Sequence, residues 1–297
     1  MIYEKTKSLL LDKYPNYSPL WDIAEREAGE SWKGEFSTHI ERVFGPNGEN
    51  GLKEAVDGYA EFCTEAIRAQ IFFEKHSRYQ ATNYDEVLQQ CYHSVDYMDR
   101  RYLPGQFLSH YVWPHHRQML RSFVNDFLPK ISAEVSRFYE VGVGCGMYSL
   151  KTLEAIPQAS GIGFDISDFA LNFTMRVVES HGFGGRYEIQ NRDIIASPVE
   201  PPCDFVVSQE VLEHLEDPPS FIEALRSMTR EGGYGYITAA INAGHTDHIY
   251  LYRSPQEVES QITEAGWTVM DSHVESNYPD KPEQLRPTVA GFLVRNR

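Results

Sequence analysis

Cysteine, positive charge and long apolar runs are all scarce in this chain of 297 residues. Its four cysteines are scattered without a Cys-x-x-Cys pair, which argues against a disulfide framework and a structural zinc site. No apolar run approaches the roughly 20 residues that a membrane helix needs. The short apolar patch near the amino terminus is interrupted at once by Asp12 and Lys13, so it lacks the apolar core of a signal peptide. We therefore expect a cytoplasmic protein without a membrane segment.

Acidic residues outnumber basic ones by 43 to 27, which gives a net charge of −16. Such a chain repels a polyanion unless its basic residues are concentrated on one surface. The best basic cluster is small, with Arg100, Arg101, Arg117 and Arg121. The composition therefore disfavours nucleic acid as a partner, while homo-oligomerisation stays open.

The hydrophobic pattern divides the chain near residue 135. Before that point, apolar residues recur at helical spacing. Helices are expected over 52–72, 84–98 and 116–128. The stretch 100–116 is rich in aromatic residues and histidines, and helical appendages of this kind often cover an active site. We therefore predict a helical, substrate-covering region over 1–135, although the stretch could also be a packed aromatic layer with surface histidines.

From residue 136 onward, short apolar runs alternate with helical segments. Strands are expected over 138–141, 162–166, 187–189, 205–208 and 234–239, and helices over 147–155, 168–180, 219–228 and 255–265. This alternation predicts an α/β domain over 136–297, with parallel strands and right-handed crossovers. The last two strands, 267–274 and 289–294, have only a polar loop between them, so an antiparallel pair at the sheet edge is expected.

A glycine-rich turn follows the first of these strands, in the sequence FYEVGVGCGMYSL. Gly142, Gly144 and Gly146 allow the backbone to approach a ligand and to adopt positive φ. A dinucleotide site prefers a further glycine where this chain has Met147. Glu140 precedes the first glycine, where a carboxylate suits a ligand with positive charge, such as an amino group or a sulfonium.

The next two strands lead to carboxylates. Asp165 ends the second strand and is followed by Ile166, and an acidic side chain there can bind both ribose hydroxyls. The third strand leads to Asp193 and Ile194, which can hold an adenine by its amino group and its face. Together with the glycine turn, these residues predict a nucleoside site. The alternative is an α/β domain with tight turns and solvated carboxylates.

In combination, these segments resemble the class I S-adenosylmethionine-dependent methyltransferases. "EVGVGCG", "GFDIS", "NRDI" and "CDFVVSQEVLEHLEDP" resemble the first four motifs of that family, and the run ending "GFLVRNR" resembles its last strand. The resemblance implies a Rossmann-like, seven-stranded domain over 136–297. It also implies that the glycines shape the cofactor pocket and that Glu140 faces its positive end, directly or through water. Asp165 would bind the ribose, Asp193 and Ile194 the adenine, and Gln209 the methionine portion.

The acceptor chemistry is expected where the fourth and fifth strands end. Glu210, Glu213 and His214 share one face if they form a helical turn, and two carboxylates and an imidazole could hold a divalent ion. His248, after the fifth strand, could complete such a site. These four residues resemble the metal site of small-RNA 2′-O-methyltransferases. The Glu-x-x-Glu-His part also resembles ubiquinone-pathway O-methyltransferases.

A metal-free reaction is the competing hypothesis, with His245 or His248 as a general base or as a group that positions the acceptor. We therefore predict His245, His248 and Glu213 as catalytic residues. Whether Glu210, Glu213, His214 and His248 bind a metal ion is left open. Substrate contacts are expected from Tyr111, Trp113, His116, Arg117 and Tyr250. The predicted function is methyl transfer to an oxygen or nitrogen of a small biosynthetic or secondary-metabolite molecule. A metal-dependent 2′-O-methyltransferase of RNA ends and a non-catalytic cofactor-binding scaffold stay open.

Overall fold

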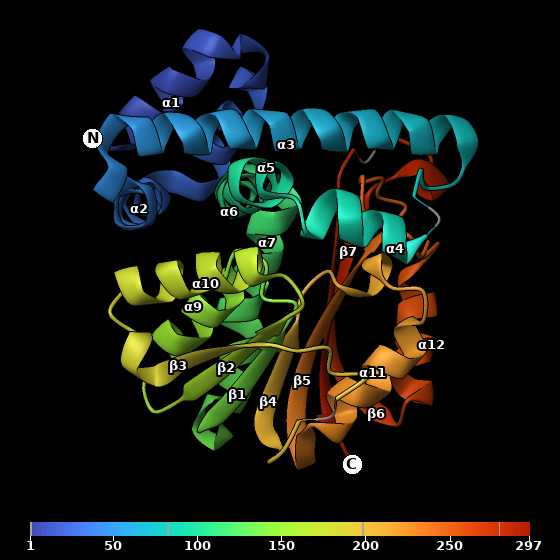
Figure 1. Ribbon diagram of the computed structural model, residues 1–297. Helices are drawn as coiled ribbons and strands as arrows, with labels where there is room; N and C mark the ends of the chain where they lie inside the picture. Colours follow the sequence, from blue (N-terminus) through green and yellow to red (C-terminus); the bar gives the residue numbers. More distant parts are fainter. Residues whose placement is uncertain (1, 82, 198, 279) are drawn as a thin grey trace.

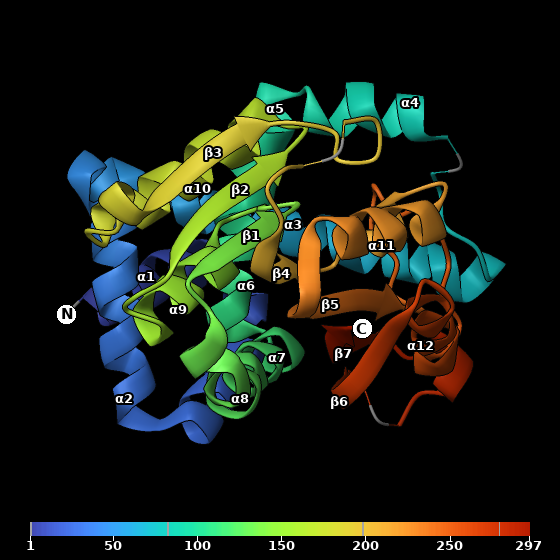
Figure 2. The ribbon, with the colours of Figure 1, turned by 90° about the horizontal axis from the view of Figure 1, so that it is seen from below.

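A seven-stranded sheet forms the centre of the computed structural model, which describes residues 2–81, 83–197, 199–278 and 280–297. The strand order is β3-β2-β1-β4-β5-β7-β6 (Figures 1 and 2). The strands are β1 Arg137–Val141, β2 Ser160–Asp165, β3 Tyr187–Asn191, β4 Cys203–Ser208, β5 Thr229–Ile241, β6 Trp267–Ser276 and β7 Thr288–Asn296. The connecting helices are α9 Met147–Ala155, α10 Asp168–Ser180, α11 Pro218–Ser227 and α12 Pro255–Glu264.

The strand pairing confirms the predicted Rossmann-like α/β class. Strands β1 to β5 pair in parallel, with α9 between β1 and β2, α10 between β2 and β3, and α11 between β4 and β5. The predicted antiparallel pair is also present, because β6 runs antiparallel to β7 and forms the edge of the sheet. β7 inserts between β5 and β6 and is antiparallel to both.

The first half of the chain is helical, as predicted. Its helices are α1 Ile2–Lys13, α2 Ser18–Phe44, α3 Gly48–His76, α4 Tyr84–Val87, α5 Val95–Tyr97, α6 Leu103–Val112, α7 Pro114–Ser122 and α8 Leu128–Ile131. The helix expected over 84–98 is divided into short pieces by π-helical turns at Leu88–Tyr92 and Met98–Tyr102. The helix expected over 116–128 is divided likewise at Phe123–Phe127. In Figure 1, α3 runs across the molecule above the sheet, with α4, α5 and α6 beneath it.

The helical segment shares a hydrophobic core with the sheet. One buried cluster joins Trp21 and Phe36 of α2 with Phe107 of α6 and Phe205 of β4. A second cluster fills the other face, under α11 and α12. Because burial of apolar surface is the main stabilising contribution to folding, this shared core holds the described helices against the sheet. The division of the chain near residue 135 into two functional regions stays a prediction.

Candidate active site

The glycine turn after β1 is built from left-handed backbone. Gly142, Gly144 and Gly146 have φ values of 75°, 48° and 73°. A Cβ at Gly142 would lie 2.3 Å from a methyl group of Val211, and one at Gly144 would lie 2.6 Å from Oε1 of Gln106. These positions therefore require glycine for both conformation and space.

A cavity of about 290 Å³ opens beside this turn. Its lining includes seven of the predicted cofactor residues: Gly142, Gly144, Asp165, Ile166, Asp193, Ile194 and Gln209. They converge because the carboxyl ends of neighbouring parallel strands lie at the same edge of the sheet. Burial raises the pKa of Asp165 to about 6, although the Ser167 amide donates to its carboxylate at 2.8 Å.

Two predicted cofactor residues lie outside this lining. The Glu140 carboxylate accepts a hydrogen bond from Ser149 of α9, whose Oγ lies 2.6 Å from the Tyr187 hydroxyl. Burial raises the pKa of Glu140 to about 8. Gly146 packs against Thr174 of α10. Glu140 is thus turned toward α9 rather than into the cavity, and a water-mediated link to the cofactor stays a prediction.

The turn that carries Glu210 and Glu213 is not a continuous helix. Glu210 has a φ of 48°, and Glu213 lies in a short 3₁₀ turn, Leu212–His214, instead of continuing a helix with Glu210. The Glu210 carboxylate lines the cavity and accepts a hydrogen bond from Gln209 at 2.5 Å. Burial raises the pKa of Glu210 to about 7. The shared helical face expected for Glu210 and Glu213 is therefore absent from the described turn.

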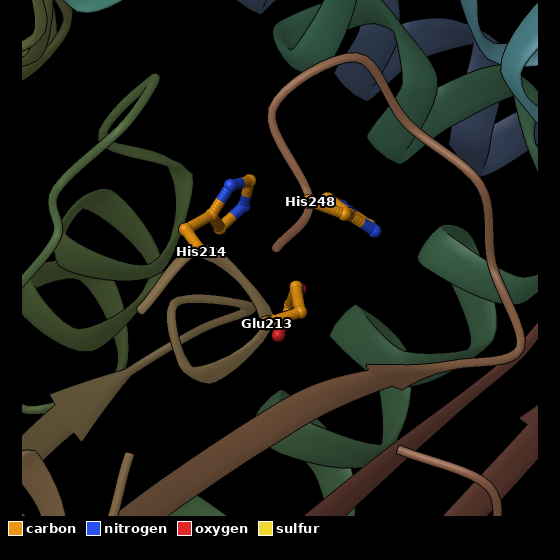
Figure 3. Close-up of side chains that lie close together, drawn as sticks. All are labelled: Glu213, His214 and His248. Carbon is orange, nitrogen blue, oxygen red and sulfur yellow. The ribbon is translucent and has the colours of Figure 1, made fainter. Parts of the chain in front are cut away.

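Glu213, His214 and His248 converge beside the cavity (Figure 3). One potential ligand atom of each lies within 4.8 Å of the others. The loop carrying His248 is fastened to the Glu213 turn, because the Glu213 carbonyl accepts hydrogen bonds from the amides of Ile249 at 2.8 Å and Tyr250 at 2.9 Å. Glu213 is fully buried, and neither of its carboxylate oxygens has a side-chain hydrogen-bond partner among the described residues. Burial raises the pKa of Glu213 well above its usual range.

Asp247 lies between two imidazoles in the same loop. Its Oδ1 is 2.6 Å from Nδ1 of His245, and its Oδ2 is 3.5 Å from Nδ1 of His214. Burial alone would raise the pKa of Asp247, but these two imidazoles hold it well below its usual range. Burial alone would lower the pKa of His245, but Asp247 raises it. The Asp247 carboxylate therefore stays ionised and stabilises a protonated His245.

None of the five predicted substrate residues is among the described residues that line the cavity. Tyr111 hydrogen-bonds to His39, and the hydroxyl of Tyr250 accepts from Gln261 at 2.9 Å. Arg117 donates to Glu27 at 2.5 Å. Trp113 stacks on Phe62 with ring centroids 5.2 Å apart, and His116 bonds through Nδ1 to Ser109 at 2.7 Å. These contacts give all five residues packing or pairing roles in the fold.

Other residues of the helical segment line the cavity instead. They are Tyr84, Tyr92, Met98, Tyr102 and Gln106. Gln106 caps the glycine turn, since its Oε1 accepts from the Cys145 amide at 2.9 Å. The Tyr92 hydroxyl lies 2.9 Å from Nδ1 of His214 and joins the helical segment to the histidine cluster. Only the aromatic richness of this half signalled such contacts in the sequence.

Residues 139–234 match the family model described as a methyltransferase domain. The chain belongs to the class I S-adenosylmethionine-dependent methyltransferases. That family uses S-adenosylmethionine, and its membership supports the predicted cofactor.

No helix among the described residues is long and apolar enough to cross a membrane.

The chain matches curated relatives over only part of their own length. The ubiquinone biosynthesis O-methyltransferase of Nitrosomonas europaea is 28% identical over 128 residues, which cover 42% of this chain and 53% of the relative. The tRNA 5-carboxymethoxyuridine methyltransferase of Escherichia coli K12 is 24% identical over 182 residues, which cover 52% of this chain and 69% of that protein. The chain thus spans about half the length of the first of these relatives.

Among solved structures, the chain is similar to the N-methyltransferase NodS from Bradyrhizobium japonicum in complex with S-adenosylhomocysteine. The identity is 19%, the TM-score is 0.48, and the match covers 62% of this chain and 91% of that one.

Proposed function

We propose that this protein transfers a methyl group from S-adenosylmethionine to an oxygen or nitrogen of a small-molecule acceptor. The observation that carries the proposal is that Gly144, Asp165 and Asp193, from three successive strand ends, line one cavity. When bound, S-adenosylmethionine supplies a methyl group on a positively charged sulfur that is a good leaving group. The chain's own task is then to align the acceptor and to remove its proton.

The proposed cofactor contacts follow from the cavity lining. Asp165 accepts hydrogen bonds from the ribose hydroxyls, and Asp193 and Ile194 hold the adenine. Gln209 contacts the methionine portion, while Gly142 and Gly144 leave room for it. Calorimetry with S-adenosylhomocysteine tests this assignment. We expect binding by the wild type, strong loss in Asp165→Ala, and no binding of NAD. Normal binding by Asp165→Ala would show that the assignment is wrong.

His245 is the proposed group that takes the acceptor's proton. Its Nδ1 faces Asp247 at 2.6 Å, which leaves Nε2 as the proton acceptor. Nε2 is buried and has no hydrogen-bond partner among the described residues. The His245 ring lies 5.9 Å from that of Tyr102, which lines the cavity. We expect His245→Asn to abolish turnover while the affinity for S-adenosylhomocysteine is kept. Turnover close to the wild-type rate would exclude this role.

A divalent cation at Glu213, His214 and His248 is a second proposal for activating the acceptor. Nδ1 of His248 faces the Ala243 carbonyl at 2.7 Å, and Nδ1 of His214 faces Tyr92, so both rings keep Nε2 as a ligand atom. A carboxylate and two imidazoles suit borderline ions such as Zn²⁺ or Mn²⁺. A bound ion would lower the pKa of an acceptor hydroxyl.

Metal analysis and chelation separate the two proposals. If the cation takes part, the purified protein should hold about one equivalent of metal, and Glu213→Gln and EDTA should remove both metal and turnover. Full turnover after EDTA, with no metal retained, would exclude the cation. His248 is then left as the alternative base to His245.

A further inference from the structure

The wall that the helical segment adds to the cavity is largely aromatic. Tyr84, Tyr92 and Tyr102 line it, together with the thioether of Met98. Tyr92 and Tyr102 are each the last residue of a π-helical turn, and such turns are frequent at functional sites. Aromatic faces bind flat rings by stacking and cations by cation–π attraction. This wall suits a ring-bearing acceptor.

The charged groups in the cavity lining are nearly all negative. Its described residues include one guanidinium, that of Arg192, and five carboxylates: Asp165, Asp193, Glu210, Glu216 and Asp217. Arg192 donates to the Ser197 carbonyl at 2.9 Å and directly precedes Asp193, which is assigned to the adenine. The end of the cavity between Tyr102 and Glu210 therefore has a carboxylate in its lining but no lysine or arginine among the residues described.

Two arginines of the helical segment are paired elsewhere, and burial lowers the pKa of His116, whose Nε2 lies 3.8 Å from Oε1 of Glu210, well below its usual range. Arg101 forms ion pairs with Glu61 at 2.9 Å and Glu65 at 3.1 Å, outside the cavity lining. Arg117, as described above, pairs with Glu27. These pairs leave neither guanidinium aimed at an acceptor.

The residues behind the wall add no net positive charge, because burial favours the neutral form of Glu213 and the ionised Asp247 is paired with His245. Glu213 and Asp247 are fully buried, and the groups that face them in the cluster are imidazoles. An acceptor carboxylate or phosphate would lose its water beside Glu210, and the positive charge of His245 is already paired with Asp247 at 2.6 Å. Removing a charge from water without a cationic partner is strongly unfavourable. A neutral or positively charged acceptor avoids this penalty.

We propose that the cavity selects its acceptor by charge: it takes an aromatic-ring compound with neutral or cationic substituents and rejects carboxylates and phosphates. This inference rests on the proposed function and narrows the class of acceptor. The tyrosine wall supplies the contact with the ring, and Glu210 supplies the discrimination against anions. The same rule excludes RNA, because every nucleotide adds a phosphate.

Three matched probes test the rule in the intact protein. Tyramine, tyrosol and 4-hydroxyphenylacetate share a phenol ring and end in an ammonium, a hydroxyl and a carboxylate. Their binding to the S-adenosylhomocysteine complex is measured by calorimetry, with EDTA present so that no metal ion adds positive charge. At about pH 8, where Glu210 is ionised, we expect the carboxylate to bind at least about tenfold more weakly than the other two.

Variants identify the groups responsible. Glu210→Gln should reduce the discrimination against the carboxylate by several-fold, whereas Glu259→Gln, which removes the same charge from the exposed face of α12, should leave it unchanged. Tyr102→Phe should retain binding of tyramine and tyrosol, and Tyr102→Leu should weaken both. Thermal unfolding of each variant checks that it is folded. Tyr92→Leu serves as the second wall variant if Tyr102→Leu does not fold.

Four results would overturn the inference. The carboxylate probe could bind as tightly as tyramine, all three probes could fail to bind, an RNA oligonucleotide could bind at low salt, or Glu210→Gln could leave the discrimination intact. Failure of the proposed function looks different, since S-adenosylhomocysteine itself would then not bind. The two ideas can thus be refuted separately.

Discussion

Cofactor affinity should depend on pH through Asp165. This carboxyl lines the cavity, and its burial raises its pKa to about 6. In the free protein it therefore takes up a proton between neutral pH and pH 5. An ionised carboxylate accepts hydrogen bonds from both ribose hydroxyls, whereas a protonated one accepts more weakly. Binding should consequently weaken as the pH falls.

The size of the effect follows from the pKa. About nine-tenths of the Asp165 carboxyls are ionised at pH 7 and about one-tenth at pH 5, so the Kd should rise by about tenfold across this interval. Asp165→Asn lacks the charge and should lose about 2 kcal/mol of binding free energy at pH 7, which is about thirtyfold in Kd. In that variant the Kd should be nearly constant over the same range.

Isothermal titration with S-adenosylhomocysteine at several pH values measures both effects. The Asn variant controls for titration of the ligand and of other cavity carboxylates. A wild-type Kd that does not change between pH 7 and pH 5, or an equal slope in the Asn variant, would refute the reasoning.

Three further predictions concern other positions. Gly144→Ala should weaken S-adenosylhomocysteine binding by about tenfold, because Gly144 has a φ of 48° and Gln106 approaches it closely. Calorimetry on the double variant with Gln106→Ala should show that part of the lost affinity is recovered. No recovery would count against a steric contact between residue 144 and Gln106. Burial would raise the pKa of Asp204, but Arg230 and nearby amides lower it to about 2. Asp204→Asn should thus cost about 2 kcal/mol of unfolding free energy at pH 7, and urea denaturation should show the deficit disappearing as the pH falls from about 4 to about 2. A deficit that persisted at the lower pH would contradict this account. Because the pKa of Glu140 is raised to about 8, wild-type stability should fall as the pH rises toward that value. In thermal unfolding, the stability of Glu140→Gln should not fall with rising pH in this way. Equal pH dependence in both proteins would exclude Glu140 as the cause of the fall.

Most of the cavity lining that is proposed to hold the cofactor could be predicted because its residues follow strands directly. Once β1, β2 and β3 pair in parallel, Gly144, Asp165 and Asp193 must meet at one edge of the sheet. Local sequence is enough for such a prediction, since a strand end fixes where the next side chain lies.

The acceptor side was harder, because its geometry depends on contacts between distant segments. The expected shared face of Glu210 and Glu213 assumed a helical turn, but the positive φ at Glu210 interrupts that turn. Which residues of the helical segment would reach the cavity could not be predicted, since π-helical turns shift the helical register and bring Tyr92 and Tyr102 into the lining.

The sequence by itself determined the α/β class, the strand ends that carry the glycine turn and the two carboxylates, and the family to which the chain belongs. Only the tertiary structure decided that Glu140 faces Ser149, that Asp247 bridges two histidines, and that tyrosines rather than the predicted substrate residues line the cavity. The physical reason is that strand periodicity is a local property. The direction of a buried polar side chain is instead set by the partners that folding brings to it.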